Sequence, residues 1–228
     1  MKKRIFYTEI AYILGLIALA LGTAFMEKAD FGLSMVVAPP YILHLKISEF
    51  LPFFTFGMAQ YTFQAGLVIL LAVFMRKFKL SYFFSFVTAV LFGFLLDGVM
   101  ILTDMLSFEG LLMRIPIYVI GMLCCTFGIA LLFRTYIPPE VYELFVKEVS
   151  EKYGYNIHRC KTVYDCTSCV LSVVLSFAFF GFGVFRGISY GTVVCALVNG
   201  TLISFFSKLL DRLFVFEDGL KLKKFFER

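Results

Sequence analysis

A small number of polar side chains interrupt the long apolar stretches of this sequence, and these residues could bind a solute. Gln60 and Gln64 are four residues apart, which places both amides on one face of a helix. Asp97 and Asn199 also lie within apolar runs, where an isolated polar group is costly and usually faces a cavity or a partner. These positions suit hydrogen bonding to a solute, and the carboxyl group also suits proton coupling or cation binding.

A second polar group follows the first apolar run, at Lys28, Asp30 and Ser34, with Gly32 allowing a sharp turn between them. A half-helix that begins there would point its free backbone N–H groups at a solute carboxylate or phosphate. The alternative is an interfacial turn, in which Asp30 or Ser34 caps a helix and Lys28 reaches the lipid head groups. We predict a solute-binding set that converges on one cavity: Lys28, Asp30, Ser34, Gln60, Gln64, Asp97 and Asn199.

Structural roles are the alternatives for the residues inside the apolar runs. Asp97 could form a structural ion pair, and a hydrogen bond between two helices is favoured for Asn199 over solute binding. A membrane enzyme would need converging His, Cys or carboxyl groups within the runs, and only Asp97 and Asn199 approach that requirement. We therefore expect no enzymatic activity and no cofactor.

The six cysteines are expected to be inert. Three fall inside apolar runs, and three lie near the predicted cytoplasmic side, where disulfides rarely persist. The residues that could be considered for a zinc site are His158, Cys160, Cys166 and Cys169. Their spacing fits no common zinc pattern, so we predict no metal.

The overall composition indicates a membrane protein. Hydrophobic residues make up 61% of the 228 residues and charged residues 16%, against roughly 45–50% and about 25% in soluble domains. A soluble domain has to cover its surface with polar groups, whereas a bilayer lets apolar side chains face outward. The net charge of +5 comes from residues at the ends of apolar runs rather than from a basic stripe. The lipid bilayer is therefore the expected partner, and nucleic-acid binding is excluded.

Six apolar runs are long enough to cross a bilayer as helices, at residues 6–26, 54–75, 81–102, 112–133, 162–180 and 188–206. The first is expected to remain as a span, because it is longer than the apolar part of a signal peptide. With few exceptions, Lys and Arg lie on the same side as the amino terminus; the exceptions are Lys28, Lys46, Arg114 and Arg186. Since short basic loops stay in the cytoplasm, both termini are predicted to be cytoplasmic.

The first and fourth runs resemble each other. Superposing them pairs Tyr12 with Tyr118, Gly15 with Gly121, Gly22 with Gly128, Ala24 with Ala130, and Lys28 with Arg134. A nearly identical offset pairs Gly93 with Gly200. We interpret the chain as two repeats of three spans each, residues 1–110 and 111–228. An odd number of spans inverts the second repeat relative to the first, an architecture that suits alternating access.

The two repeats differ most between their first and second spans. In the first repeat, Pro39–Pro40 interrupts segment 29–45, which predicts a re-entrant or interfacial piece. In the second, Pro138–Pro139 opens an amphipathic helix predicted over residues 138–153 on the cytoplasmic surface, a gate or a lateral anchor. Its exposed face is expected to carry the ion pairs Glu143–Lys147 and Glu148–Lys152. The predicted fold is thus an all-α membrane protein with a basic cytoplasmic tail.

Three stretches resemble the YczE/YitT/YyaS-type family of bacterial integral membrane proteins. They are Lys28-Ala29-Asp30-Phe31-Gly32-Leu33-Ser34, Thr55-Phe56-Gly57 and the segment from Gly191 to Gly200. Met35 stands where the family usually has proline, so the backbone there is expected to differ. The resemblance implies a multi-pass protein of the bacterial cytoplasmic (inner) membrane and a vitamin-like or amine solute, and it carries over no catalytic residue.

The function expected from these observations is a secondary transporter or permease. Its substrate would be a small organic solute that is amphiphilic or aromatic, since the 30 Phe residues would supply apolar walls to a site between the repeats. The alternative is a non-transporting assembly or sensory subunit, and a homodimer is left open.

Overall fold

The computed structural model describes residues 4–106, 110–155 and 157–220. Within this part of the chain, six helices are long and apolar enough to cross a membrane. They are α1 (Thr8–Ala29), α3 (Phe56–Met75), α4 (Leu80–Asp104), α5 (Leu111–Leu132), α7 (Ile157–Phe180) and α8 (Tyr190–Leu213). The prediction of a helical fold with six candidate membrane spans is confirmed, and it indicates a multi-pass membrane protein.

Two further helices are too short to span a bilayer, α2 (Ala38–Ile47) and α6 (Val141–Tyr153). At 1.5 Å per residue, the 10 residues of α2 reach only about 15 Å. Asp30 ends α1 in the left-handed conformation, with φ of 54°, and Pro39 and Pro40 occupy the first turn of α2, where proline is well tolerated. The predicted interruption of segment 29–45 is therefore a turn followed by a short helix.

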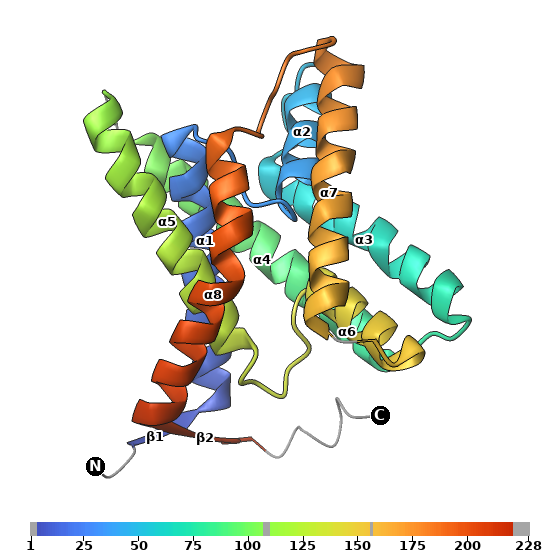
Figure 1. Ribbon diagram of the computed structural model, residues 1–228, viewed down its shortest axis with the longest axis vertical. Coiled ribbons are helices and arrows are strands. Elements are labelled where there is room, and N and C mark those ends of the chain that lie inside the picture. Colours follow the sequence, from blue (N-terminus) through green and yellow to red (C-terminus); the bar gives the residue numbers. More distant parts are fainter. Residues whose placement is uncertain (1–3, 107–109, 156, 221–228) are drawn as a thin grey trace.

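The most extensive helix contact is between α1 and α5, which lie side by side (Figure 1). Glycines allow their backbones to approach closely: a Cβ added at Gly22 would lie 2.5 Å from the Gly121 carbonyl oxygen, and one added at Gly15 would lie 3.1 Å from the Gly128 carbonyl oxygen. The glycines that recur between the first and fourth spans therefore serve helix packing. Helix α4 packs against α1, and α8 packs against α5.

The remaining helices pack unequally. Helix α3 lies along α4, and both contact α6. Helix α7 packs against α2 and α6, but within the described residues α7 and α8 do not pack together as α3 and α4 do. Figure 1 shows α7 standing beside α2, with the connection to α8 crossing at the top of the view.

A two-stranded parallel ribbon joins the two ends of the described chain, an element that the sequence did not predict. It is formed by β1 (Arg4–Tyr7) and β2 (Phe214–Glu217), which immediately precede α1 and follow α8. The Phe6 ring packs against those of Phe214 and Phe216 at centroid distances of 5.1 and 5.7 Å. The ribbon places the start of α1 and the end of α8 at the same end of the molecule (Figure 1).

The predicted amphipathic helix is present as α6, but its first turns are more deeply packed than expected, because they contact α3, α4 and α7. Val141 is fully buried, and Glu148 is also buried. Glu148 pairs with Lys79 of the α3–α4 loop at 2.7 Å and accepts a hydrogen bond from Tyr82 at 3.0 Å. Lys152 donates to the Phe74 carbonyl oxygen. Of the two expected ion pairs, Glu148–Lys152 is therefore replaced by contacts of both residues to α3, α4 and the loop between them.

Candidate solute-binding site

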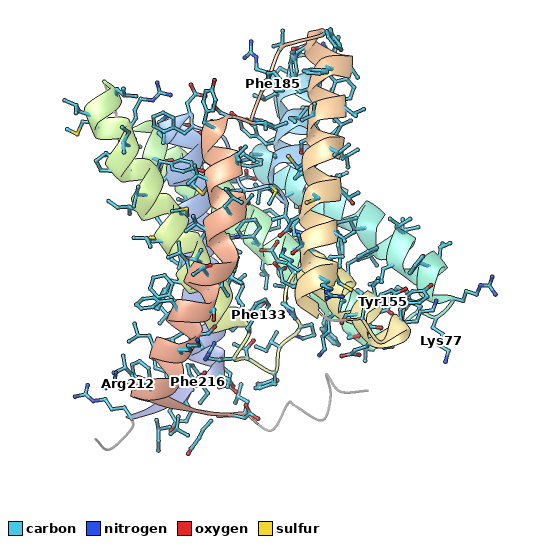
Figure 2. The ribbon with its side chains drawn as sticks, in the orientation of Figure 1. Lys77, Phe133, Tyr155, Phe185, Arg212 and Phe216 are labelled. Atoms are coloured by element: carbon cyan, nitrogen blue, oxygen red, sulfur yellow. The ribbon has the colours of Figure 1, made fainter. Side chains whose placement is uncertain are left out.

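Two cavities lie at opposite ends of α1. The large cavity, of about 810 Å³, reaches Thr8 at the start of α1, and the small cavity, of about 260 Å³, reaches Met26 and Glu27 near its end. The 22 residues of α1 separate these ends by about 33 Å. Figure 2 labels Phe133 and Phe216, which line the large cavity, and Phe185, which lines the small one.

The large cavity has a charged rim at the end of the molecule that carries the β ribbon. Its lining includes Lys79, Arg134, Lys147 and Glu148. Lys79 is held by Glu148, and Arg134 donates to Asp211 at 2.7 and 2.8 Å. The lining carries three cations against two carboxylates, Glu148 and Asp218, and two of the cations are already paired, so the rim is polar with a small excess of positive charge.

The Pro138–Pro139 turn lines the large cavity and is fixed by hydrogen bonds to α4. Thr88 donates to the Pro138 carbonyl oxygen at 2.9 Å, and Ser85 donates to the Pro139 carbonyl oxygen. The Thr88 hydroxyl also lies 2.9 Å from the hydroxyl of Tyr12 on α1. Because proline lacks a backbone N–H group, this turn is held mainly through its carbonyl groups.

Behind the turn lies a polar cluster formed by Gln60 and Gln64 of α3 with Glu140 and Tyr142 of α6 and its preceding loop. The Gln64 amide donates to Glu140 Oε2 at 2.8 Å, and its carbonyl oxygen accepts from the Val141 N–H at 3.0 Å. Tyr142 donates to Gln60 Oε1 at 2.9 Å. Two buried atoms of the cluster, Gln60 Nε2 and Glu140 Oε1, have no hydrogen-bond partner.

Glu140 is the most perturbed charged group of the cluster, with only 3% of the residue exposed. Burial, followed by the negative charge of Glu143, raises the pKa of Glu140 to about 8, while the hydrogen bond from Gln64 acts in the opposite direction. Burial also raises the pKa of Glu143 itself. At neutral pH a carboxyl group of this kind exchanges protons readily, and such groups concentrate at functional sites.

Sequence reasoning missed Glu140 because the residue begins a segment that reads as an amphipathic surface helix. A signal was present in the two proline pairs: Ala38-Pro39-Pro40 and Ile137-Pro138-Pro139 both follow the first span of their repeat. The first pair opens a helix whose start is buried, with Ala38 fully buried. The matching proline pairs therefore mark two helices whose starts are both buried in the structure.

Asp97 lies at a close approach of α3 and α4, where a Cβ added at Gly57 would clash with the Gly93 carbonyl oxygen and with Asp97 itself. It accepts a hydrogen bond from the Thr55 hydroxyl at 2.6 Å and one from the Gly57 N–H at 2.7 Å. Its carboxylate therefore stabilises the amino-terminal end of α3, where free N–H groups and the helix dipole favour a negative charge. Gly57 lies one turn before Gln60, so Asp97 is close to the polar cluster along α3.

The residues of the turn after α1 lie at the far end of the molecule from the large cavity. Lys28 pairs with Asp104 at 2.6 Å, and Asp30 pairs with Arg114 at 2.9 Å. The Ser34 carbonyl oxygen accepts from the N–H groups of two following residues in the turn before α2. Asp30 lines the small cavity together with Glu27 and Tyr41, whose hydroxyl donates to Glu27 at 3.0 Å.

Asn199 lies on α8 and takes no part in the hydrogen bonds of the polar cluster. Its buried Oδ1 has no hydrogen-bond partner.

The structure places the seven predicted residues in separate parts of the molecule. Gln60 and Gln64 meet in the polar cluster, Asp97 anchors the start of α3, and Lys28, Asp30 and Ser34 lie near the small cavity. The expected convergence of all seven on one cavity is not found among the described residues, because the turn after α1 and the Pro138–Pro139 turn lie near opposite ends of α1.

Neither a metal cluster nor a disulfide is found in the part of the chain that the structure describes. The side chain of His158, one of the residues considered for zinc, lies outside the described residues.

The comparisons give a family and no characterised relative. Neither the search of curated proteins nor the search of solved structures found a match. A family model matches residues 6–208, which include all six long apolar helices except the last residues of α8. The chain belongs to the family described as "Family of unknown function (DUF6198)".

Proposed function

We propose that this protein is a secondary transporter for a small organic solute and that it works by alternating access. The paired arrangement of cavities supports this proposal. A cavity enters from each end of α1, while the glycine-mediated contact of α1 with α5 and the polar cluster close the space between them. A closed centre with a cavity at each end fits stepwise transport better than an open channel.

The observation that carries the proposal is the unequal packing of helix pairs that correspond in the two sequence repeats. Helices α1, α3 and α4 correspond in order to α5, α7 and α8. The pairs α1–α4 and α5–α8 pack alike, but α3 lies along α4 whereas α7 and α8 are apart. If the second repeat is inverted relative to the first, exchanging these two packings would close one end of the molecule and open the other.

The space around the matched glycines Gly93 of α4 and Gly200 of α8 differs in the same way as the packing of the two helix pairs. A Cβ added at Gly93 would lie 2.8 Å from the Gly57 carbonyl oxygen, so this position is tightly packed. A Cβ added at Gly200 would meet no atom within 4 Å. In the exchanged conformation, Gly200 is expected to occupy a close contact like that of Gly93.

The cavities also bear on the class of solute. The small cavity presents the Glu27 carboxyl group beside the Tyr41 ring, a combination that suits an amine attached to an apolar or aromatic body. The resemblance to the YczE/YitT/YyaS-type family suggests a vitamin-like amine as well. On the charge bias of the loops, the large cavity would face the cytoplasm of a bacterial cell.

A thermal-shift screen followed by an uptake assay tests the proposal. Purified protein is screened against vitamin-like amines and small aromatic solutes, because a solute that binds the folded state raises its apparent stability. We expect at least one hit that accumulates in proteoliposomes containing the protein. A hit that binds but does not cross the membrane would contradict transport and favour a sensory or assembly subunit.

Gly200→Ala separates transport from folding in the same assay. The substitution should leave the melting temperature unchanged or slightly raised, since the added methyl group has free space and alanine favours a helix, and it should slow uptake by obstructing the exchanged packing. Gly98→Ala is the matched control, because an added Cβ at Gly98 also meets no atom within 4 Å. Equal uptake by both variants would contradict an exchange of packing at Gly200.

A further inference from the structure

We infer that Glu140 is a proton-binding switch: the neutral acid holds the Pro138–Pro139 turn against α3 and α4, and release of the proton frees the turn. The inference deepens the proposed function, because it would make the proton the coupled ion. Proton binding and movement of the turn can be tested without a solute, so they can fail or hold independently of transport.

The hydrogen bonding of Glu140 fits a neutral acid better than a carboxylate. One oxygen accepts from the Gln64 amide at 2.8 Å, and the other, also buried, has no donor. A buried carboxylate is costly unless several donors or a cation compensate its charge. Glu148, on the same helix, shows that compensated arrangement, with Lys79 and Tyr82 as its partners.

The charged groups around Glu140 also favour its neutral form. From α6 itself, Glu143 acts as a second negative charge, and burial raises its pKa too. From α7, Lys161 acts in the opposite direction, but its ammonium group already pairs with Asp165 at 3.1 Å. Helix α3 contributes the uncharged amides Gln60 and Gln64 to the cluster.

The side chains that fix the turn explain how a proton could change the conformation. Glu140 joins the turn to α3, while Ser85 and Thr88 join it to α4. When the carboxyl O–H bond breaks, the proton passes to water in the large cavity, and the remaining carboxylate gains by moving toward that water. Rebinding a proton reverses both steps. The same motion would extend the large cavity toward Gln60, whose free amide donor could then bind a solute acceptor.

Infrared spectroscopy tests proton binding directly. In purified protein without solute, the carbonyl stretch of protonated carboxyl groups should weaken on raising the pH from about 6 to about 9. Glu140→Gln should remove the Glu140 part of that change, whereas Glu148→Gln, which removes another buried carboxyl group of α6, should retain it. An unchanged titration in Glu140→Gln, or no titrating carboxyl band in the native protein, would overturn the inference.

Thiol labelling tests movement of the turn. Ala89 of α4 is fully buried and packs in the same cluster as Val141 and Leu144 of α6. In a variant whose native cysteines are replaced, labelling of Ala89→Cys should accelerate with pH by up to about tenfold per pH unit, measured relative to the same protein with Glu140→Gln. This ratio cancels the pH dependence of the thiol itself.

Ala20→Cys, placed in the central core next to α5, is the matched control and should show a constant ratio. A constant ratio at Ala89→Cys as well would overturn the coupling between Glu140 and the turn. If both solute-free tests succeed while no solute is taken up, the switch stands and the proposed transport function fails.

Discussion

Gly22→Ala provides a quantitative test of the central contact between α1 and α5. The added Cβ would lie 2.5 Å from the Gly121 carbonyl oxygen and 2.6 Å from the Cys125 backbone nitrogen. These distances are about 1 Å shorter than the optimum for non-bonded contacts, so the two helices have to separate. The opposing atoms belong to the backbone and cannot move aside as a flexible side chain could. We expect a loss of about 1–3 kcal/mol in the free energy of unfolding, the usual range for overpacking.

Gly66→Ala is the matched control on α3, because an added Cβ there meets no atom within 4 Å. Alanine favours a helix over glycine by about 1 kcal/mol, so this variant should be unchanged or slightly more stable. Thermal denaturation of both purified variants in one detergent measures the difference, with a lowering of several degrees expected for Gly22→Ala alone. Equal melting temperatures for Gly22→Ala and the native protein would refute close packing of the two backbones.

Three further predictions concern other parts of the molecule. Asp97→Asn should lower the free energy of unfolding by about 1–2 kcal/mol, because the amide keeps one acceptor for the start of α3 and loses the charge. Unchanged stability would argue against a role of Asp97 in stabilising the start of α3. The free energy of unfolding of the native protein should decrease as pH rises from about 5 to about 9, because folding raises the pKa of Glu140 to about 8 and the unfolded chain releases this proton at lower pH. In thermal denaturation, Glu140→Gln should flatten this pH dependence. Reporter fusions after Glu217 and between α4 and α5 should report opposite sides of the membrane, with the first in the cytoplasm, and a shared side would contradict the six-span topology.

The spans and the presence of closely packed helix faces were predictable from the sequence because both depend on local patterns. A bilayer requires about 20 apolar residues in each spanning helix, whatever their neighbours are. Recurring glycines such as Gly22 and Gly128 indicate close packing before the partner helix is known. These signals need no knowledge of how helices are rotated about their axes.

The candidate site was less predictable because it depends on that rotation and on long-range contacts. Glu140 lies in an amphipathic stretch whose charges read as solvent-exposed, yet α3 and α4 bury it. Asp97 looked like an isolated acid, but its partners Thr55 and Gly57 lie some forty residues earlier in the chain. The parallel pairing of β1 with β2 also joins segments from opposite ends of the sequence, which no local pattern indicates.

Distances between spin labels test alternating access most directly. One pair of labels replaces the exposed residues Val174 of α7 and Leu197 of α8, and the second replaces the exposed Ile69 of α3 and Phe83 of α4. In lipid nanodiscs, each pair should show two distance populations, and a change of pH or addition of a solute that binds should shift them in opposite directions, so that α7 approaches α8 as α3 leaves α4. A single distance for each pair that stays constant under every condition would contradict the proposed exchange.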